Sequence, residues 1–306
     1  MFRSAITATT ILLAMATGAM AQVELKQKIL ENGKTTASTR SKVHQVLSIA
    51  DQEVETKTDQ TIVVTSVSGK RAADGTIRLT TKVDSLKANL NLPGGVELEF
   101  DSAKPVEPQG TQYDILLNLM QVVAKTSSTS VHGKDNRVVS IEVDTSEHEK
   151  LDDMLKKMIK GRFEPEYLKE ASNKKMDQIP SQPVKKGDTW EIEQTVRLEA
   201  GQTMTFKTTY KYAGTIDRKG KTLHKITFIS TEVEYAQDDP DAQAKVINSN
   251  LKIKASDGTI LFDQKLGRVV EQEEMVHIIG DMTFSINDQE LPAKLDLKFD
   301  TKTAVK

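Results

Sequence analysis

Apolar and polar residues alternate along much of this chain, and this alternation restricts the fold more than any other feature of the sequence. The segments 139–144, 251–256 and 295–300 each place an apolar side chain at every second position. Successive side chains of a strand point to opposite faces of a sheet, so each segment predicts a strand with one buried and one solvated face. Parallel strands are buried on both faces and would show continuous apolar runs. The alternation therefore predicts antiparallel sheet.

Turn residues separate many of the extended segments. Glycine, asparagine and aspartate tolerate the positive φ that tight hairpins require, so clusters of these residues predict turns between strands. The clusters are Asn32-Gly33, Asp74-Gly75, Pro93-Gly94-Gly95, Gly133 to Asn136, Lys219-Gly220 and Asp257-Gly258.

The middle of the chain departs from the alternation and predicts helices. Within 146–160 the apolar residues recur at helical spacing and share one face. Ser146 and Glu149 have the spacing of a capping box, which predicts that the helix begins there. A second helix is expected over 165–176 and a third over 113–123.

Together these elements predict an α+β fold that is rich in β structure. Two β halves, about 22–144 and 184–306, are expected to form a curved antiparallel sheet or sheets. The helices of 146–180 join the halves and pack on the concave face, so that 22–306 is a single domain. A glycine turn, a short strand and a Phe-Asp pair recur at 95–101 and 258–263. This recurrence fits two related halves, but such pairs also recur by chance in β proteins.

The first 21 residues have the three parts of a secretory signal peptide. Arg3 supplies the positive charge, 5–17 is uncharged and mainly apolar, and Ala19-Met20-Ala21 is a small-residue cleavage site. We therefore expect the chain to be exported, to a periplasm or to the outside of the cell, with Gln22 as its first residue. The alternative is an N-terminal anchor that stays attached, although a membrane span needs about 20 strongly apolar residues. We expect no transmembrane segment in the mature chain.

The composition excludes several classes of function. The 42 basic and 44 acidic residues give a net charge of -2, which lacks the basic surplus that nucleic-acid binding needs. The chain has no cysteine, which excludes disulfides, thiolate metal sites and cysteine nucleophiles. A protein without free thiols also suits an oxidising compartment outside the cytosol.

The sequence predicts no catalytic residue, no metal site and no cofactor. The five histidines lack the spacing of zinc ligands. His148 and Asp152 lie one helical turn apart and could share a metal ion, but an acidic first helical turn explains the same residues. Among 44 acidic residues no carboxylate pair stands out as a catalytic dyad. An enzyme would need residues that are distant in the sequence to converge on one cleft.

Two short stretches carry a resemblance to a known family. One is Pro183 followed by Gly187-Asp188-x-Trp190, and the other is Phe262-Asp263 followed by Gly267-Arg268. With the signal peptide and the strand–helix–strand order, they resemble an uncharacterised family of secreted bacterial β-rich proteins, a domain of unknown function. The resemblance implies no catalytic residue. In architecture alone the chain is also similar to periplasmic lipoprotein and lipid carriers, in which helices cover the concave face of a curved antiparallel sheet.

We predict a non-catalytic protein that binds an apolar or lipid-like ligand between the sheet and the helices. Methionine is adaptable and suits such a lining. Trp190, the single tryptophan, either anchors the core or offers a stacking platform to a ligand. The expected lining residues are Leu151, Met154, Leu155, Met158, Ile159 and Trp190. Ordinary core packing is the alternative for this helix face. A second hypothesis is a structural or protein-interaction module of the cell envelope, with an envelope protein as its partner.

Overall fold

The computed structural model describes residues 22–50, 52–104, 110–111, 113–151, 153–198, 201–237, 244–286 and 289–306. The predicted signal peptide, 1–21, and Asp152 lie outside the described residues.

The described residues form twelve strands that belong to one antiparallel sheet. The order across the sheet is β6-β5-β3-β2-β1-β12-β11-β10-β9-β8-β7, and β4 pairs with β3 beside this path. The bounds are β1 Lys34–Ile49, β2 Gln52–Ser68, β3 Ile77–Leu92, β4 Val96–Asp101, β5 Ser127–His132, β6 Val138–Val143, β7 Thr189–Arg197, β8 Gln202–Arg218, β9 Lys221–Gln237, β10 Ala244–Asp263, β11 Arg268–Ile286 and β12 Gln289–Val305. The antiparallel sheet that the alternation predicts is therefore confirmed.

The two β halves meet in the middle of the sheet, where the first strand pairs with the last. Val43 of β1 lies opposite Phe299 of β12, and the pairing runs from Ala37 to Ile49 along β1. Strands β1 to β6 lie on one side of this seam and β7 to β12 on the other. The halves thus form one continuous sheet, a point that the sequence leaves open.

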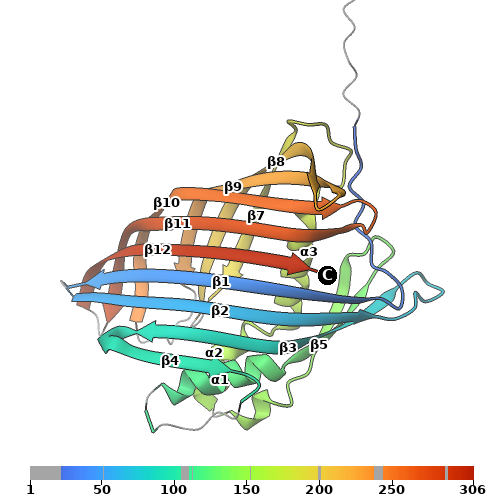
Figure 1. Cartoon of the computed structure of the whole chain (residues 1–306). Coiled ribbons are helices and arrows are strands. Elements are labelled where there is room, and N and C mark those ends of the chain that lie inside the picture. The colour runs from blue at the N-terminus through green and yellow to red at the C-terminus, as the bar shows by residue number, and fades with distance from the viewer. Residues whose placement is uncertain are drawn as a thin grey trace, which may run out of the picture.

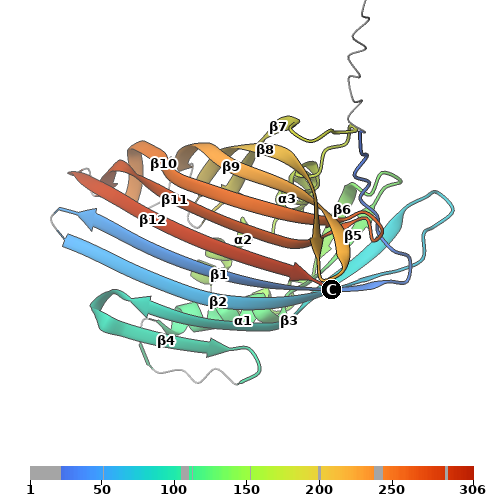
Figure 2. The same cartoon turned by 45° about the horizontal axis from the view of Figure 1, so that its top comes forward.

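Three α-helices and two 3₁₀ turns complete the described structure. They are α1 Asp114–Lys125, α2 Asp153–Lys160, α3 Pro165–Asp177, η1 Pro93–Gly95 and η2 His148–Lys150. The predictions for α1 and α3 are confirmed to within two residues. The sheet bends around the side that carries the helices (Figures 1 and 2).

The start of α2 differs from the predicted helix over 146–160. The Asp144 carboxylate accepts a hydrogen bond from the Ser146 amide at 3.0 Å, which holds Ser146 in a turn. A 3₁₀ turn follows, and Leu151 has an extended backbone with ψ 155°. The predicted capping box is therefore wrong, because the hydrogen bond to Asp144 competes with helix initiation at Ser146.

One predicted turn lies inside a strand. Asp257-Gly258 is in the middle of β10, which continues to Asp263. Gly258 lies opposite Phe228 of β9, and the Phe228 ring occupies the space that a Cβ atom at position 258 would need. A glycine inside a strand often marks such a close approach instead of a turn.

The recurring Phe-Asp pairs share a physical role at the ends of β4 and β10. The Asp101 carboxylate accepts a hydrogen bond from the Ala103 amide at 3.1 Å, and the Asp263 carboxylate accepts one from the Lys265 amide at 2.9 Å. Phe100 and Phe262 are both buried. In each case the phenylalanine anchors the end of a strand and the aspartate closes the turn that follows.

Candidate functional site between the sheet and the helices

Helices α1 and α2 enclose an apolar pocket with the inner face of β2 and β3. Its volume is about 250 Å³, and we call it the helix pocket. Gln60 and Arg162 supply its polar groups. The other lining residues are apolar, and they are Ile62, Leu86, Leu116, Leu119, Met120, Val123, Ile159 and Phe163.

The pocket exists because α1 is only partly in contact with the sheet. Leu117 and Val122 of α1 are buried. Leu116, Leu119 and Met120 are only half-buried, although they face the pocket. If α1 were packed flush against the sheet, all of its apolar side chains would be covered. Because these three are not, apolar surface remains accessible in the helix pocket.

The structure separates the residues that the sequence places in one cavity. Ile159 lines the helix pocket, and Leu155 is buried at 3% exposure beside it in α2. Leu151 precedes α2 and is half-buried. The side chains of Met154 and Met158 lie outside the described residues. Trp190 lies in β7, at the opposite end of the strand order from β5 and β6.

The sequence analysis did not predict that residues of α1 line the pocket. Their shared helix face was visible in the segment 113–123, which has apolar residues at helical spacing. What the pattern did not contain is the location of α1 on β3, which depends on contacts distant in the sequence. Periodicity identifies an apolar face but not the surface that the face meets.

Helix α3 bridges the gap between the two end strands of the sheet. On the β6 side, the Asn173 amide group accepts a hydrogen bond from the Val138 backbone N–H at 2.8 Å and donates one to its carbonyl at 3.0 Å. On the β7 side, the Tyr167 hydroxyl accepts a hydrogen bond from the Arg197 backbone N–H at 3.1 Å. Side chains of one helix thus replace missing strand partners on both edges.

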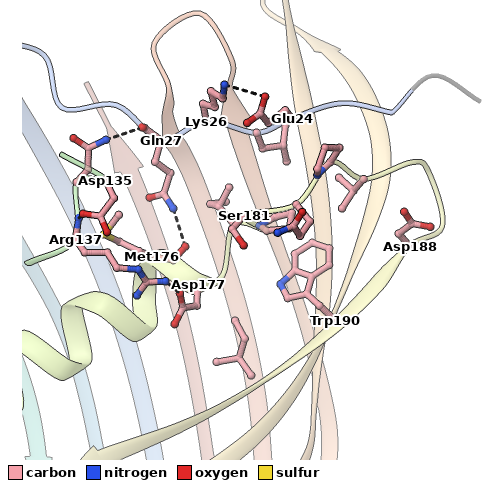
Figure 3. Close-up of a pocket in the computed structure, with 18 of the residues that line it drawn as sticks. Glu24, Lys26, Gln27, Asp135, Arg137, Met176, Asp177, Ser181, Asp188 and Trp190 are labelled. Carbon is pink, nitrogen blue, oxygen red and sulfur yellow. Dashed lines mark hydrogen bonds and ion pairs between the residues drawn. The ribbon is translucent and has the colours of Figure 1, made fainter. Parts of the chain in front are cut away.

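A larger, open groove lies beside β7 (Figure 3), and we call it the edge groove. Its volume is about 1320 Å³. The first half of β7, with Trp190, forms one side of it. The N-terminal segment 24–28, the turn 134–137 and the end of α3 form the other side, and 179–184 also contributes. The groove therefore lies where the sheet is open.

Trp190 combines a stacked ring with an unsatisfied polar atom. Its ring stacks on Tyr210 with the centroids 5.7 Å apart and an interplanar angle of 15°. Its indole Nε1 is enclosed and has no hydrogen-bond partner among the described residues. Nearby, Gly187 adopts φ 103° and its amide donates to the Tyr212 carbonyl at 2.8 Å. The Gly-Asp-x-Trp stretch thus forms the turn that begins β7, and it sets the register of β7 with β8.

Burial shifts the pKa values of several groups around the inner face. It raises the pKa of Glu274 on β11, and it raises the pKa of Tyr210, to which the Glu274 charge adds. The Glu274 carboxyl group is therefore partly desolvated.

The structure does not test the metal site considered at His148 and Asp152, because Asp152 lies outside the described residues. The Nε2 atom of His148 lies 3.1 Å from the Thr126 hydroxyl, and its ring packs on Phe163 at 4.7 Å between centroids. His148 thus ties the end of α1 to the start of α3. No group of three or more histidine or acidic residues with metal-binding geometry occurs within the described parts of the chain.

A family model identifies the protein family of this chain. A model of a family of unknown function, DUF6263, matches residues 74–269, which is more than half of the chain. The chain belongs to DUF6263. Both stretches that carry the resemblance, the Gly-Asp-x-Trp turn and the Phe262-Asp263 hairpin, lie within the matched region of this DUF6263 protein.

Three solved structures show distant likenesses to the DUF6263 chain. A structure concerning lipid–protein interactions in lipovitellin has 10% identity and a TM-score of 0.42, and the match covers 91% of this chain and 25% of that chain. A mutant porin of Rh. blastica has 7% identity and a TM-score of 0.26, with 87% and 99% covered. A DUF1329 family protein from Desulfovibrio piger has 8% identity and a TM-score of 0.13, with 85% and 83% covered. At these TM-scores none of the three bears on function.

None of the curated proteins compared with this sequence matches it. Among the helices of the described residues, none has the length and apolar character that crossing a bilayer requires.

Proposed function

We propose that this DUF6263 protein is an exported, non-catalytic binding protein that holds an apolar or lipid-like ligand in the helix pocket. The observation that carries the proposal is the accessible apolar surface of Leu116, Leu119 and Met120 inside a pocket between helix and sheet. Burying apolar surface in such a pocket is favourable, at about 25 cal/mol per Å². Export rests on the signal peptide of the sequence.

The dimensions and lining of the pocket indicate the kind of ligand. A volume of about 250 Å³ lies just below the range of roughly 300–1,000 Å³ for small-molecule sites. It suits a single acyl chain or a group of similar size. Gln60 and Arg162 supply polar atoms for a head group. Met120 lets the lining adapt to chains of different shape.

Native mass spectrometry of the protein purified from its own host tests both export and binding. We expect a chain that begins at Gln22 and carries an apolar adduct that organic solvent removes. The Leu119→Trp variant fills the pocket, so it should lose the adduct and bind the fluorescent fatty acid cis-parinaric acid at least tenfold more weakly. Asn118→Trp, at the exposed neighbouring position in α1, is the matched control. A chain without adduct, and equal affinity in both variants, would contradict ligand binding.

A further inference from the structure

Strand β7 ends the sheet and leaves part of its backbone unpaired. Hydrogen bonding alternates along an antiparallel strand, so every second residue directs its N–H and C=O away from the neighbouring strand. The Arg197 amide points to the edge, because it donates to the Tyr167 hydroxyl instead of to β8. The register between β7 and β8 has no shift, so Thr189, Glu191 and Glu193 point the same way. Their edge-facing backbone groups have no partner in the described part of the chain.

This unpaired stretch of β7 borders open space. Thr189 to Glu193 line the edge groove. Among the described residues, the bonds of α3 and its N-cap Glu164 to β7 involve Arg197, at the far end of the strand. A further strand would lie about 4.8 Å from β7, and five residues of it would span about 17 Å. A groove of about 1320 Å³ accommodates such a segment. Figure 3 shows Trp190 among the residues that line this groove.

We propose that the edge groove receives an extended polypeptide segment that pairs with β7 and alternates basic and apolar residues. The unpaired amides and carbonyls select a backbone as the partner. Glu191 and Glu193 are exposed on the outer face, where cross-strand pairing favours lysine or arginine opposite them. Trp190 and Ile192 point to the inner face and favour apolar side chains there. The alternation follows from the two faces of one strand.

Two basic residues on the far side of the groove are paired with acids. Arg137 pairs with Asp177, and Lys26 pairs with Glu24 at 3.0 Å. The stem of Lys28 packs against Gly267, on the hairpin between β10 and β11. Lys134 and Lys174 also line the groove, and Lys207 of β8 lies 3.7 Å from Glu191. The preference for a basic strand therefore rests on Glu191 and Glu193, which would lie directly beside its residues.

The same acids act against a second copy of this chain as the occupant. Antiparallel pairing of β7 with its own copy would place glutamates opposite glutamates, and like charges directly opposite each other destabilise a sheet. A basic segment of another protein meets no such repulsion.

Trp190 allows a direct measurement, because it is the only tryptophan and lines the groove. The probe is a synthetic six-residue peptide that alternates lysine and leucine, titrated against the purified protein while Trp190 emission is recorded. We expect saturable binding that is at least tenfold tighter than for a peptide of alternating glutamate and leucine. N-methylation of two edge-pairing amides of the lysine peptide should weaken binding about tenfold, since it removes two backbone hydrogen bonds.

Variants separate strand pairing from general charge attraction. Glu193→Pro removes an N–H that has no partner among the described residues, and it blocks pairing, so it should abolish the binding. Glu191→Lys with Glu193→Lys should reverse the preference toward the glutamate peptide. Glu97→Lys with Glu99→Lys, an equal charge change at two exposed positions of β4, should leave both affinities within twofold. Circular dichroism confirms folding of each variant.

Three results would overturn the inference. They are equal binding of the N-methylated peptide, an unchanged preference in the Glu191 and Glu193 double variant, or self-association that Glu193→Pro abolishes. The test is independent of the helix pocket, because Leu119→Trp should bind the lysine peptide normally even where it loses cis-parinaric acid.

Discussion

Gly258 lies inside β10, where any side chain would meet the ring of Phe228. Phe228 is buried at 3% exposure and packs on Tyr210 with the ring centroids 5.1 Å apart. Tyr210 in turn stacks on Trp190. Because Gly258 has no Cβ atom, three aromatic rings can form a row across β9, β8 and β7. This row ends at the edge groove.

We predict that Gly258→Ala destabilises the fold by about 1–3 kcal/mol, because the new methyl group displaces a buried ring in a packed core. Urea denaturation followed by circular dichroism measures the change. Gly69→Ala is the matched control, since its Cβ atom would have only the Arg78 carbonyl within reach, at 4.0 Å. Equal midpoints for the two variants would show that the ring moves aside at no cost.

At the scale of elements, α3 links the two end strands of the open sheet. Its Asn173 side chain takes the place of a strand along β6, and its Tyr167 hydroxyl caps β7. Arg197 also lies over the Tyr167 ring at 4.8 Å and pairs with Glu164. Ion pairs at exposed positions contribute little, so the hydrogen bonds to the strand edges are the main link.

Asn173→Ala should cost about 1–2 kcal/mol, because two backbone groups of Val138 lose their partners. Hydrogen exchange with mass spectrometry should show faster exchange in β6 and little change in β1 or β12. Lys174→Ala, at the exposed next position in α3, should leave exchange in β6 as it is. If β6 exchanged at the same rate in all three proteins, α3 would not be holding this edge.

For the whole molecule, buried histidines couple stability to pH. Burial lowers the pKa of His132, His148 and His224 below the ordinary value near 6.5. The unfolded chain therefore takes up protons first as the pH falls, and stability that is fully present above pH 6.5 is lost on acidification. Glu274 acts in the opposite direction, because burial raises its pKa and its proton uptake favours the folded state.

We predict a lower free energy of unfolding at pH 5.5 than at pH 7.5. Three histidines destabilise the folded state on acidification, whereas one carboxyl group stabilises it. Urea titrations at the two pH values measure it. His148→Gln should reduce the difference and Glu274→Gln should enlarge it. A protein that becomes more stable at pH 5.5, in the parent chain and in Glu274→Gln alike, would contradict the prediction.

The sequence by itself determined the local structure of this protein. Alternation in 295–300 specifies a two-faced strand, and helical spacing in 113–123 and 165–176 specifies helices, because these periods belong to the backbone geometry of each element. The predicted turn at 257–258 is an exception, as is the predicted helix start at Ser146. A glycine that makes room for Phe228 has the same local pattern as a glycine in a turn.

Tertiary structure alone decided how these elements meet. The pairing of β1 with β12 joins residues about 260 positions apart, and no local pattern encodes that partner. The same holds for the sites: Ile159 and Trp190 both follow apolar patterns, yet one lines the helix pocket and the other the edge groove. A period tells which face of an element avoids water, whereas the neighbour that covers this face is selected by packing of the complete chain.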